Sequence, residues 1–168
     1  LSPKLSAIVR PTDRLAVYLN GGYGFHSNDA RGAVSSNGKG SLARGIGGEV
    51  GLRFSPDRRL RTSVDVWYLY LQSELVWSGD NGGTEPSDPT RRYGVDLDLT
   101  FEPTPWLSFD ANLAVARATL VANQGNGGAL ALAPRLMGGA GVALHRKNDY
   151  VSLRVRGIGD RPANDDGS

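Results

Sequence analysis

Two histidines and two closely spaced aspartates are the residues of this sequence whose types could support acid–base chemistry. The chain has only His26 and His145, and neither stands with a serine and an aspartate in an order specific to a nucleophilic triad. Asp96 and Asp98 share one side of an extended segment, where paired carboxylates could act, but ordinary residues on the wet face of a strand have the same spacing. We therefore expect no catalytic residues and no enzymatic activity.

Three polar or glycine-rich stretches partly match ligand-binding motifs, and each fails at a position that its chemistry requires. Residues 37–41 lack the glycine spacing and the Gly-Lys-Ser/Thr ending of a phosphate loop. Residues 45–47 are followed by Val50, where the dinucleotide fingerprint needs its third glycine. Residues 80–83 lack the ligand spacing of a calcium loop, and the chain has no cysteine for a thiolate site. We expect no metal and no cofactor.

One polar segment carries side chains suited to binding a ligand. His26, Asn28, Asp29 and Arg31 offer an imidazole, an amide, a carboxylate and a guanidinium within a few positions of one another. Loops held by a rigid scaffold often carry binding residues, although a lone loop histidine can equally be a plain surface residue. These four residues are our candidate ligand-binding set.

The segments that would position this loop alternate apolar and polar residues. The clearest case is 93–102, where every second residue is apolar and Asp96 and Asp98 stand between. A period of two is typical of a strand, whereas an amphipathic helix needs apolar spacings of three and four. We expect eight strands, at roughly 4–11, 15–25, 43–55, 60–77, 92–102, 107–119, 134–145 and 150–159.

The connections between these strands alternate in length. Four are short and rich in turn-forming residues, whereas residues 26–42, 78–91 and 120–133 form long polar loops. Short turns at one rim and long loops at the other are typical of bacterial outer-membrane barrels. The expected fold is therefore all-β, an antiparallel up-and-down meander of about eight strands that forms an arc of a transmembrane β-barrel.

The charged and the aromatic side chains also fall on opposite faces of the expected sheet, as the wall of a membrane barrel requires. Eight charged residues would line one polar side of the sheet, with opposite charges paired across strands: Glu49, Arg53, Asp65, Asp96, Asp98, Asp110, Arg154 and Arg156. Aromatic residues would form two interfacial girdles on the other side, with Phe54, Phe101, Trp106 and Tyr150 near the short turns and Tyr23, Phe25, Trp77 and Tyr93 near the long loops.

Charge and hydropathy exclude two other classes. The 19 lysines and arginines are scattered and the net charge is only +2, so we expect no nucleic-acid partner. No run approaches the roughly 20 apolar residues of a spanning helix, whereas a spanning strand needs only about 9–11 residues.

Several segments at which strands end and loops begin follow one another along the chain in an order shared by a known family. They lie at residues 2–32, with a glycine–aromatic stretch at 21–25; at 49–54 and 62–77; and at 92–96 and 157–162. Together they resemble the C-terminal part of the barrel of TonB-dependent outer-membrane receptors. That family folds as a barrel of about 22 strands plugged by an N-terminal domain.

The resemblance implies a function and a location. It implies a receptor in the outer membrane of a Gram-negative bacterium, in contact with outer-membrane lipid, that imports a scarce extracellular solute such as a ferric siderophore or cobalamin. The energy-coupling inner-membrane protein would act through the plug. We expect residues 1–168 to be a partial barrel domain without the plug and without the C-terminal strand. The alternative is a complete small eight-stranded barrel with an adhesin or structural role, in which the first and last strands would pair.

Overall fold

The computed structural model describes residues 1–27, 42–73, 75–78, 83–86, 88–121, 128–130 and 132–162. Within these ranges the chain forms ten strands: β1 (Lys4–Thr12), β2 (Leu15–Ser27), β3 (Leu42–Phe54), β4 (Leu60–Leu71), β5 (Leu75–Ser78), β6 (Gly83–Pro86), β7 (Thr90–Thr104), β8 (Leu107–Leu120), β9 (Leu136–Arg146) and β10 (Asp149–Ile158). None of the described residues belongs to a helix with the length and apolar character needed to span a bilayer.

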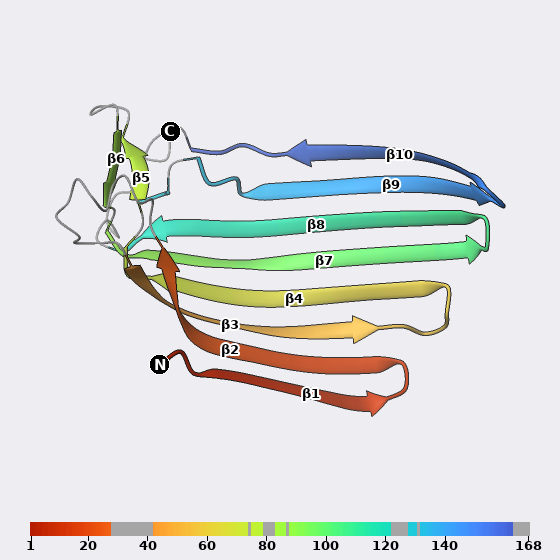
Figure 1. Ribbon diagram of the computed structural model, residues 1–168, viewed down its shortest axis with the longest axis horizontal. Helices are drawn as coiled ribbons and strands as arrows, with labels where there is room; N and C mark the ends of the chain where they lie inside the picture. Colours follow the sequence, from red (N-terminus) through yellow and green to blue (C-terminus); the bar gives the residue numbers. More distant parts are fainter. Residues whose placement is uncertain are drawn as a thin grey trace.

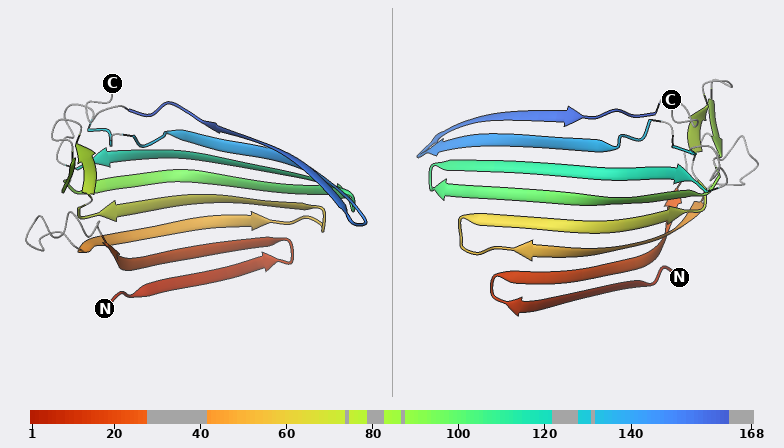
Figure 2. Two further views of the ribbon diagram at one scale, coloured as in Figure 1. Left: turned by 45° about the horizontal axis from the view of Figure 1, so that its top comes forward. Right: turned by 180° about the vertical axis from the view of Figure 1, so that it is seen from behind.

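Eight of the strands form one antiparallel sheet in the order β1-β2-β3-β4-β7-β8-β9-β10. The strands of this sheet lie side by side in a single curved layer, with the four short turns at one end and the start of β1 and the end of β10 at the other (Figures 1 and 2). Each strand pairs with its sequence neighbours in the sheet, which confirms the expected meander and excludes a Greek-key sandwich. Among the described strands, β1 and β10 are the two edges and do not pair with each other, so the sheet does not close as the small-barrel alternative requires.

The short turns are shaped by local hydrogen bonds and backbone conformation. Between β3 and β4, the Asp57 carboxylate accepts hydrogen bonds from the backbone amides of Arg59 and Leu60, at 2.8 and 3.0 Å. Between β9 and β10, only two residues separate the paired Arg146 and Asp149, and Lys147 takes a positive φ of 51° to close the turn. These turns join neighbouring strands with little freedom and so help to fix the register.

The register places every second residue on one face across the whole sheet. We call the face that carries Leu97 the apolar face and the face that carries Asp98 the polar face. Two purely aliphatic rows cross the apolar face: Leu19, Val50, Val66, Val95, Val115 and Leu136; and Val17, Leu52, Val64, Leu97 and Leu113. The residues of the first row are 42–51 % exposed, because no second layer covers them.

Aromatic residues flank these aliphatic rows on the apolar face. Toward the long loops, Tyr68 pairs directly with Tyr93, and Tyr23 lies in the next row. Toward the turns, the rings of Phe101 and Phe109 stack with centroids 6.4 Å apart. The two expected girdles are present in outline, with two exceptions. Tyr150 pairs with His145 and therefore falls on the polar face, and Trp77 belongs to β5, outside this sheet.

The second long loop departs from the expectation. The strand expected at 60–77 ends at Leu71, which pairs with Thr90 at the start of β7. The apolar residues at 75–77 instead enter β5, which pairs with β6 in a separate two-stranded sheet that stands across the loop end (Figure 1). The prediction that this loop lacks regular structure was wrong.

Candidate functional site on the polar face

The four predicted ligand-binding residues lie at the loop end of β2. The backbone of His26 pairs with that of Ala43 in β3. Asn28, Asp29 and Arg31 lie outside the described residues, as does the side chain of His26. Whether the four approach one another stays a prediction.

The polar face carries all eight charged residues assigned to it from the sequence. The register places Asp65 opposite Asp96 and Asp98 opposite Asn112, while Glu49 and Arg53 lie on the same side of β3. Opposite charges are not paired throughout, because Asp65 and Asp96 are directly opposed like charges.

One cluster on this face surrounds Gly51. The Tyr18 hydroxyl donates a hydrogen bond to the Asp65 carboxylate, and these side chains meet over Gly51, which stands between them in the ladder. A Cβ at Gly51 would collide with both partners. The Arg53 guanidinium lies 5.7 Å from the centre of the Tyr18 ring, close enough for a cation–π contact. The missing side chain at Gly51 is therefore what allows a contact across three strands.

The same arrangement recurs along β4. Two of its polar-face side chains, Trp67 and Leu71, lie over glycines of neighbouring strands: a Cβ at Gly94 would stand 2.7 Å from the Trp67 ring, and one at Gly45 would stand 2.8 Å from Leu71. Both glycines pair directly with the residue that covers them. The glycines let bulky side chains lie flat against the wall.

On the same polar face, toward the β10 edge, a glycine also separates an ion pair. Arg154 in β10 reaches across Gly141 in β9 and binds the Asp110 carboxylate of β8 at 2.8 Å. A Cβ at Gly141 would stand 2.7 Å from that carboxylate. Asn112, Gly139 and Arg156 repeat this order in the next polar row.

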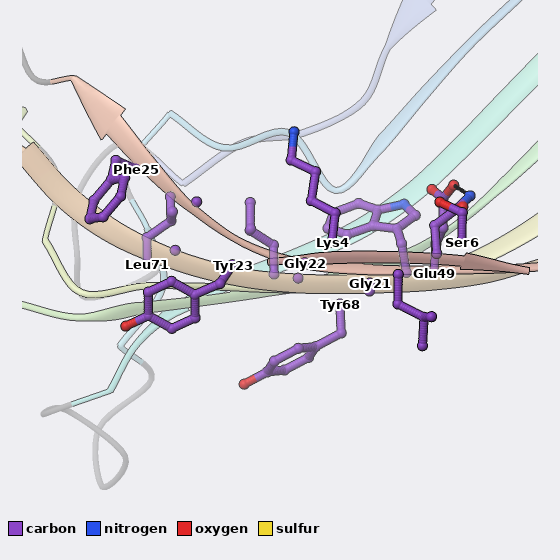
Figure 3. Close-up of a pocket in the computed structure, with 17 residues that line it drawn as sticks. Lys4, Ser6, Gly21, Gly22, Tyr23, Phe25, Glu49, Tyr68 and Leu71 are labelled. Atoms are coloured by element: carbon purple, nitrogen blue, oxygen red, sulfur yellow. Dashed lines mark hydrogen bonds between the residues drawn. The ribbon is translucent and has the colours of Figure 1, made fainter. Parts of the chain in front are cut away.

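A hollow of about 560 Å³ lies where β1, β2, β3 and β4 meet near the loop end. Paired glycines line its floor, with Gly22 opposite Gly47 and Gly24 opposite Gly45. Asn20 donates a hydrogen bond of 2.8 Å to Glu49 at its rim. Figure 3 shows Lys4, Ser6 and Glu49 on one side of the sheet, and Tyr23 and Tyr68 on the other.

The second histidine makes no triad in the described residues. His145 Nε2 lies 3.4 Å from Ser108 Oγ, and its ring centroid lies 4.9 Å from that of Tyr150. No described carboxylate is hydrogen-bonded to its ring. In the same part of the chain, no three acidic or histidine side chains gather in a way that could hold a metal ion.

The fold and its two faces define a class of protein, a wall segment of a membrane β-barrel. The sequence matches the family described as "TonB dependent receptor-like, beta-barrel" over residues 1–168. The chain belongs to this family, whose barrels lie in the outer membrane of Gram-negative bacteria, bind extracellular solutes and interact with TonB. Its members are receptors and transporters rather than enzymes.

Solved structures share the fold. The ferric yersiniabactin uptake receptor FyuA from Yersinia pestis aligns with a TM-score of 0.71 and 18% identity, over 98% of this chain and 26% of that chain. The ferric citrate transporter FecA aligns at 0.73 and 19%, over 99% and 26%, and the copper transporter OprC at 0.76 and 18%, over 94% and 26%. The chain thus spans about a quarter of each receptor. A search of curated proteins found none that matches the sequence.

Proposed function

We propose that residues 1–168 form part of the barrel wall of a TonB-dependent receptor that imports a scarce solute across the outer membrane. The observation that carries the proposal is the division of the sheet into an apolar face with two unbroken aliphatic rows and a polar face with eight charged residues. Such a wall fits lipid on one side and a polar lumen on the other.

The proposed solute is a ferric chelate. Two of the structural relatives named above are iron-chelate receptors, and the third is a copper transporter. Cobalamin and chelated copper are therefore the competing solutes in the test.

The transport proposal is tested by uptake in cells. The complete receptor is expressed in a Gram-negative strain that lacks its own iron-chelate receptors, and uptake of a panel of iron-55 chelates, of labelled cobalamin and of labelled chelated copper is measured. We expect uptake of at least one chelate, and loss of that uptake when TonB is deleted. Equal uptake with and without TonB would overturn the proposal, whereas uptake of only cobalamin or copper would reassign the solute.

We further propose that His26, Asn28, Asp29 and Arg31 contact the solute from the outer surface. Their imidazole, amide, carboxylate and guanidinium groups suit a polar chelate, and the segment that carries them continues β2 and precedes β3 at the loop end. Replacement of His26 or Arg31 by alanine should weaken solute binding about tenfold, the scale of a moderate binding residue. Asn37→Ala, in the same segment, is the matched control and should bind as the parent does.

A further inference from the structure

At the turn that joins β9 and β10, the apolar face ends in a pair of opposite charges. Arg146 and Asp149 pair directly across the two-residue turn, and both continue the face that carries Leu144 and Val151. Residues directly opposite each other in an antiparallel ladder have Cβ atoms about 4.5–5.5 Å apart. A cation and an anion therefore lie side by side where the apolar face meets this turn.

The neighbouring strands end differently on this face. Near the other short turns, the ladder places uncharged residues there: Leu15, Phe54, Leu60, Phe101 and Leu107. In the described part of the chain, neither the Arg146 nor the Asp149 side chain takes part in an ion pair or a hydrogen bond, not even with the other. Both side chains are exposed, so both charges are available to an external group.

A hollow of about 540 Å³ adjoins this pair. Its lining comprises Trp106, Leu144, His145, Arg146, Asp149 and Val151. The indole and the two aliphatic side chains are exposed, and Leu107, which pairs with Leu144, continues the aliphatic surface onto β8. The hollow therefore combines a dipolar end, an aromatic ring and an aliphatic floor that leads onto the apolar face.

These features specify an amphiphile with a zwitterionic head. The Arg146 guanidinium suits a phosphate, because it can donate parallel hydrogen bonds to two phosphate oxygens. The Asp149 carboxylate suits a primary ammonium, which can also lie against the Trp106 ring. Ethanolamine phosphate joins these two groups through two carbons, as a directly opposed pair of side chains requires. Acyl chains attached to it would cover Leu144 and Val151, whereas a soluble zwitterion would leave them exposed to water.

We propose that the end of the β9–β10 hairpin binds phosphatidylethanolamine, with the phosphate on Arg146 and the ammonium on Asp149. The short turns of outer-membrane barrels face the periplasm, and tryptophan is enriched at membrane–water interfaces, so the lipid belongs to the inner leaflet. This assignment rests on the proposed position of the chain in an outer membrane. The bound lipid holds the hairpin at a fixed depth in that membrane.

The test compares phosphatidylethanolamine with phosphatidylglycerol of the same acyl chains, which has the phosphate but no ammonium. Each lipid is titrated into the complete receptor in a non-ionic detergent, and binding is followed by native mass spectrometry. The parent receptor should bind phosphatidylethanolamine about fivefold more tightly, the upper range for an exposed ion pair. This comparison needs no variant.

Two variants separate the two contacts. R146Q removes the phosphate contact that both lipids share, so it should weaken binding of both by about fivefold. D149N removes only the ammonium contact, so it should weaken phosphatidylethanolamine about fivefold without weakening phosphatidylglycerol, and the preference should disappear. R58Q and D13N make the same changes of charge in exposed side chains of other short turns. These controls lie several strands from the hollow, beyond the Debye length of about 10 Å, and should change binding less than about twofold.

Folding of each variant is checked by its heat-modifiable mobility in gel electrophoresis. Equal binding of the two lipids by the parent receptor overturns the proposal, as does a folded D149N variant that keeps the preference. Equal weakening in R58Q and D13N also overturns it. Displacement of the lipid by free ethanolamine phosphate at matching concentration has the same consequence, because the site would then select a soluble zwitterion. The titration contains no transported solute, so its failure leaves the transport proposal standing, and a failed uptake assay leaves this result standing.

Discussion

Single glycines decide which side chains can cross the polar face. Gly51 has no Cβ, and the Tyr18–Asp65 hydrogen bond occupies the space that a Cβ would need. At Gly24, on the same face of the adjacent strand, a Cβ would meet nothing within 4 Å. The two positions therefore form a matched pair in which local space alone differs.

Gly51→Ala should destabilise the folded receptor by about 1–3 kcal/mol, the usual cost of forcing an added methyl into a packed site. Urea unfolding from detergent micelles, followed by tryptophan fluorescence, measures the change. Gly24→Ala should be neutral or stabilising by up to about 1 kcal/mol, because alanine loses less backbone freedom than glycine. Equal effects at both positions would mean that the Tyr18–Asp65 contact does not constrain Gly51.

The turn between β3 and β4 provides a second residue-scale prediction. Asp57→Ala removes an acceptor that binds the backbone amides of Arg59 and Leu60, and should cost about 1 kcal/mol in the same unfolding experiment. Asp57→Asn keeps an acceptor oxygen and should retain most of the stability. If Asp57→Ala and Asp57→Asn both unfolded at the same urea concentration as the parent, the Asp57 side chain would not stabilise this turn.

At the scale of the strands, the face on which a residue lies should decide how strongly an introduced charge destabilises the receptor. Val95 lies in the first aliphatic row on the apolar face, and its neighbour Asp96 lies on the polar face. Val95→Arg should destabilise the receptor in lipid vesicles by about 2–4 kcal/mol, as expected for a cation in the middle of a bilayer. Asp96→Arg introduces the same side chain one residue away and separates the like charges of Asp65 and Asp96, so a change within about 1 kcal/mol is expected.

Unfolding of both variants by guanidinium chloride in vesicles provides the measurement. The proposal that lipid covers the apolar face holds only if Val95→Arg lowers the free energy of unfolding clearly more than Asp96→Arg does. A larger cost at Asp96 would place the lipid on the opposite face.

Alternation along the chain was sufficient to predict the eight strands of the large sheet and the faces of their residues. A shift of one residue would move every apolar side chain to the wrong face, so the register follows once one face must be apolar. This is why all eight charged residues fell on one face as expected. The β5–β6 hairpin was missed because apolar residues 75–77 extend the pattern of β4, and only the start of β7 at Thr90 shows that the sheet stops.

The role of the glycines was also missed, although the sequence contains a signal for it. Gly45, Gly47 and Gly51 occupy alternate positions of β3 that share the polar face. Glycine weakens a strand, so repeated glycines on one face indicate that neighbouring side chains lie over them. The partners that cover them could not be predicted, because they depend on the register between strands.

Considered as a whole, the sheet has no second layer to cover its apolar face. Buried apolar side chains in the described part of the chain are few and peripheral, comprising Ala43, Leu71, Leu120, Ala129, Leu130 and Ala143. The edge strands β1 and β10 are exposed at every residue. A sheet of this kind depends on lipid at its apolar face and on further strands at its edges.

An isolated polypeptide of residues 1–168 should therefore aggregate in buffer without detergent. Its open edges present unpaired backbone groups, and its aliphatic rows form an apolar patch far larger than soluble monomers expose. Size-exclusion chromatography with light scattering should show large assemblies in buffer, and non-ionic detergent should reduce them because micelles cover the aliphatic rows. The two open edges would still pair between copies, so dimers and small oligomers should persist in detergent. A monomer with a sharp, reversible thermal transition in plain buffer would contradict the dependence on lipid and on neighbouring strands, and with it the assignment of this chain to a barrel wall.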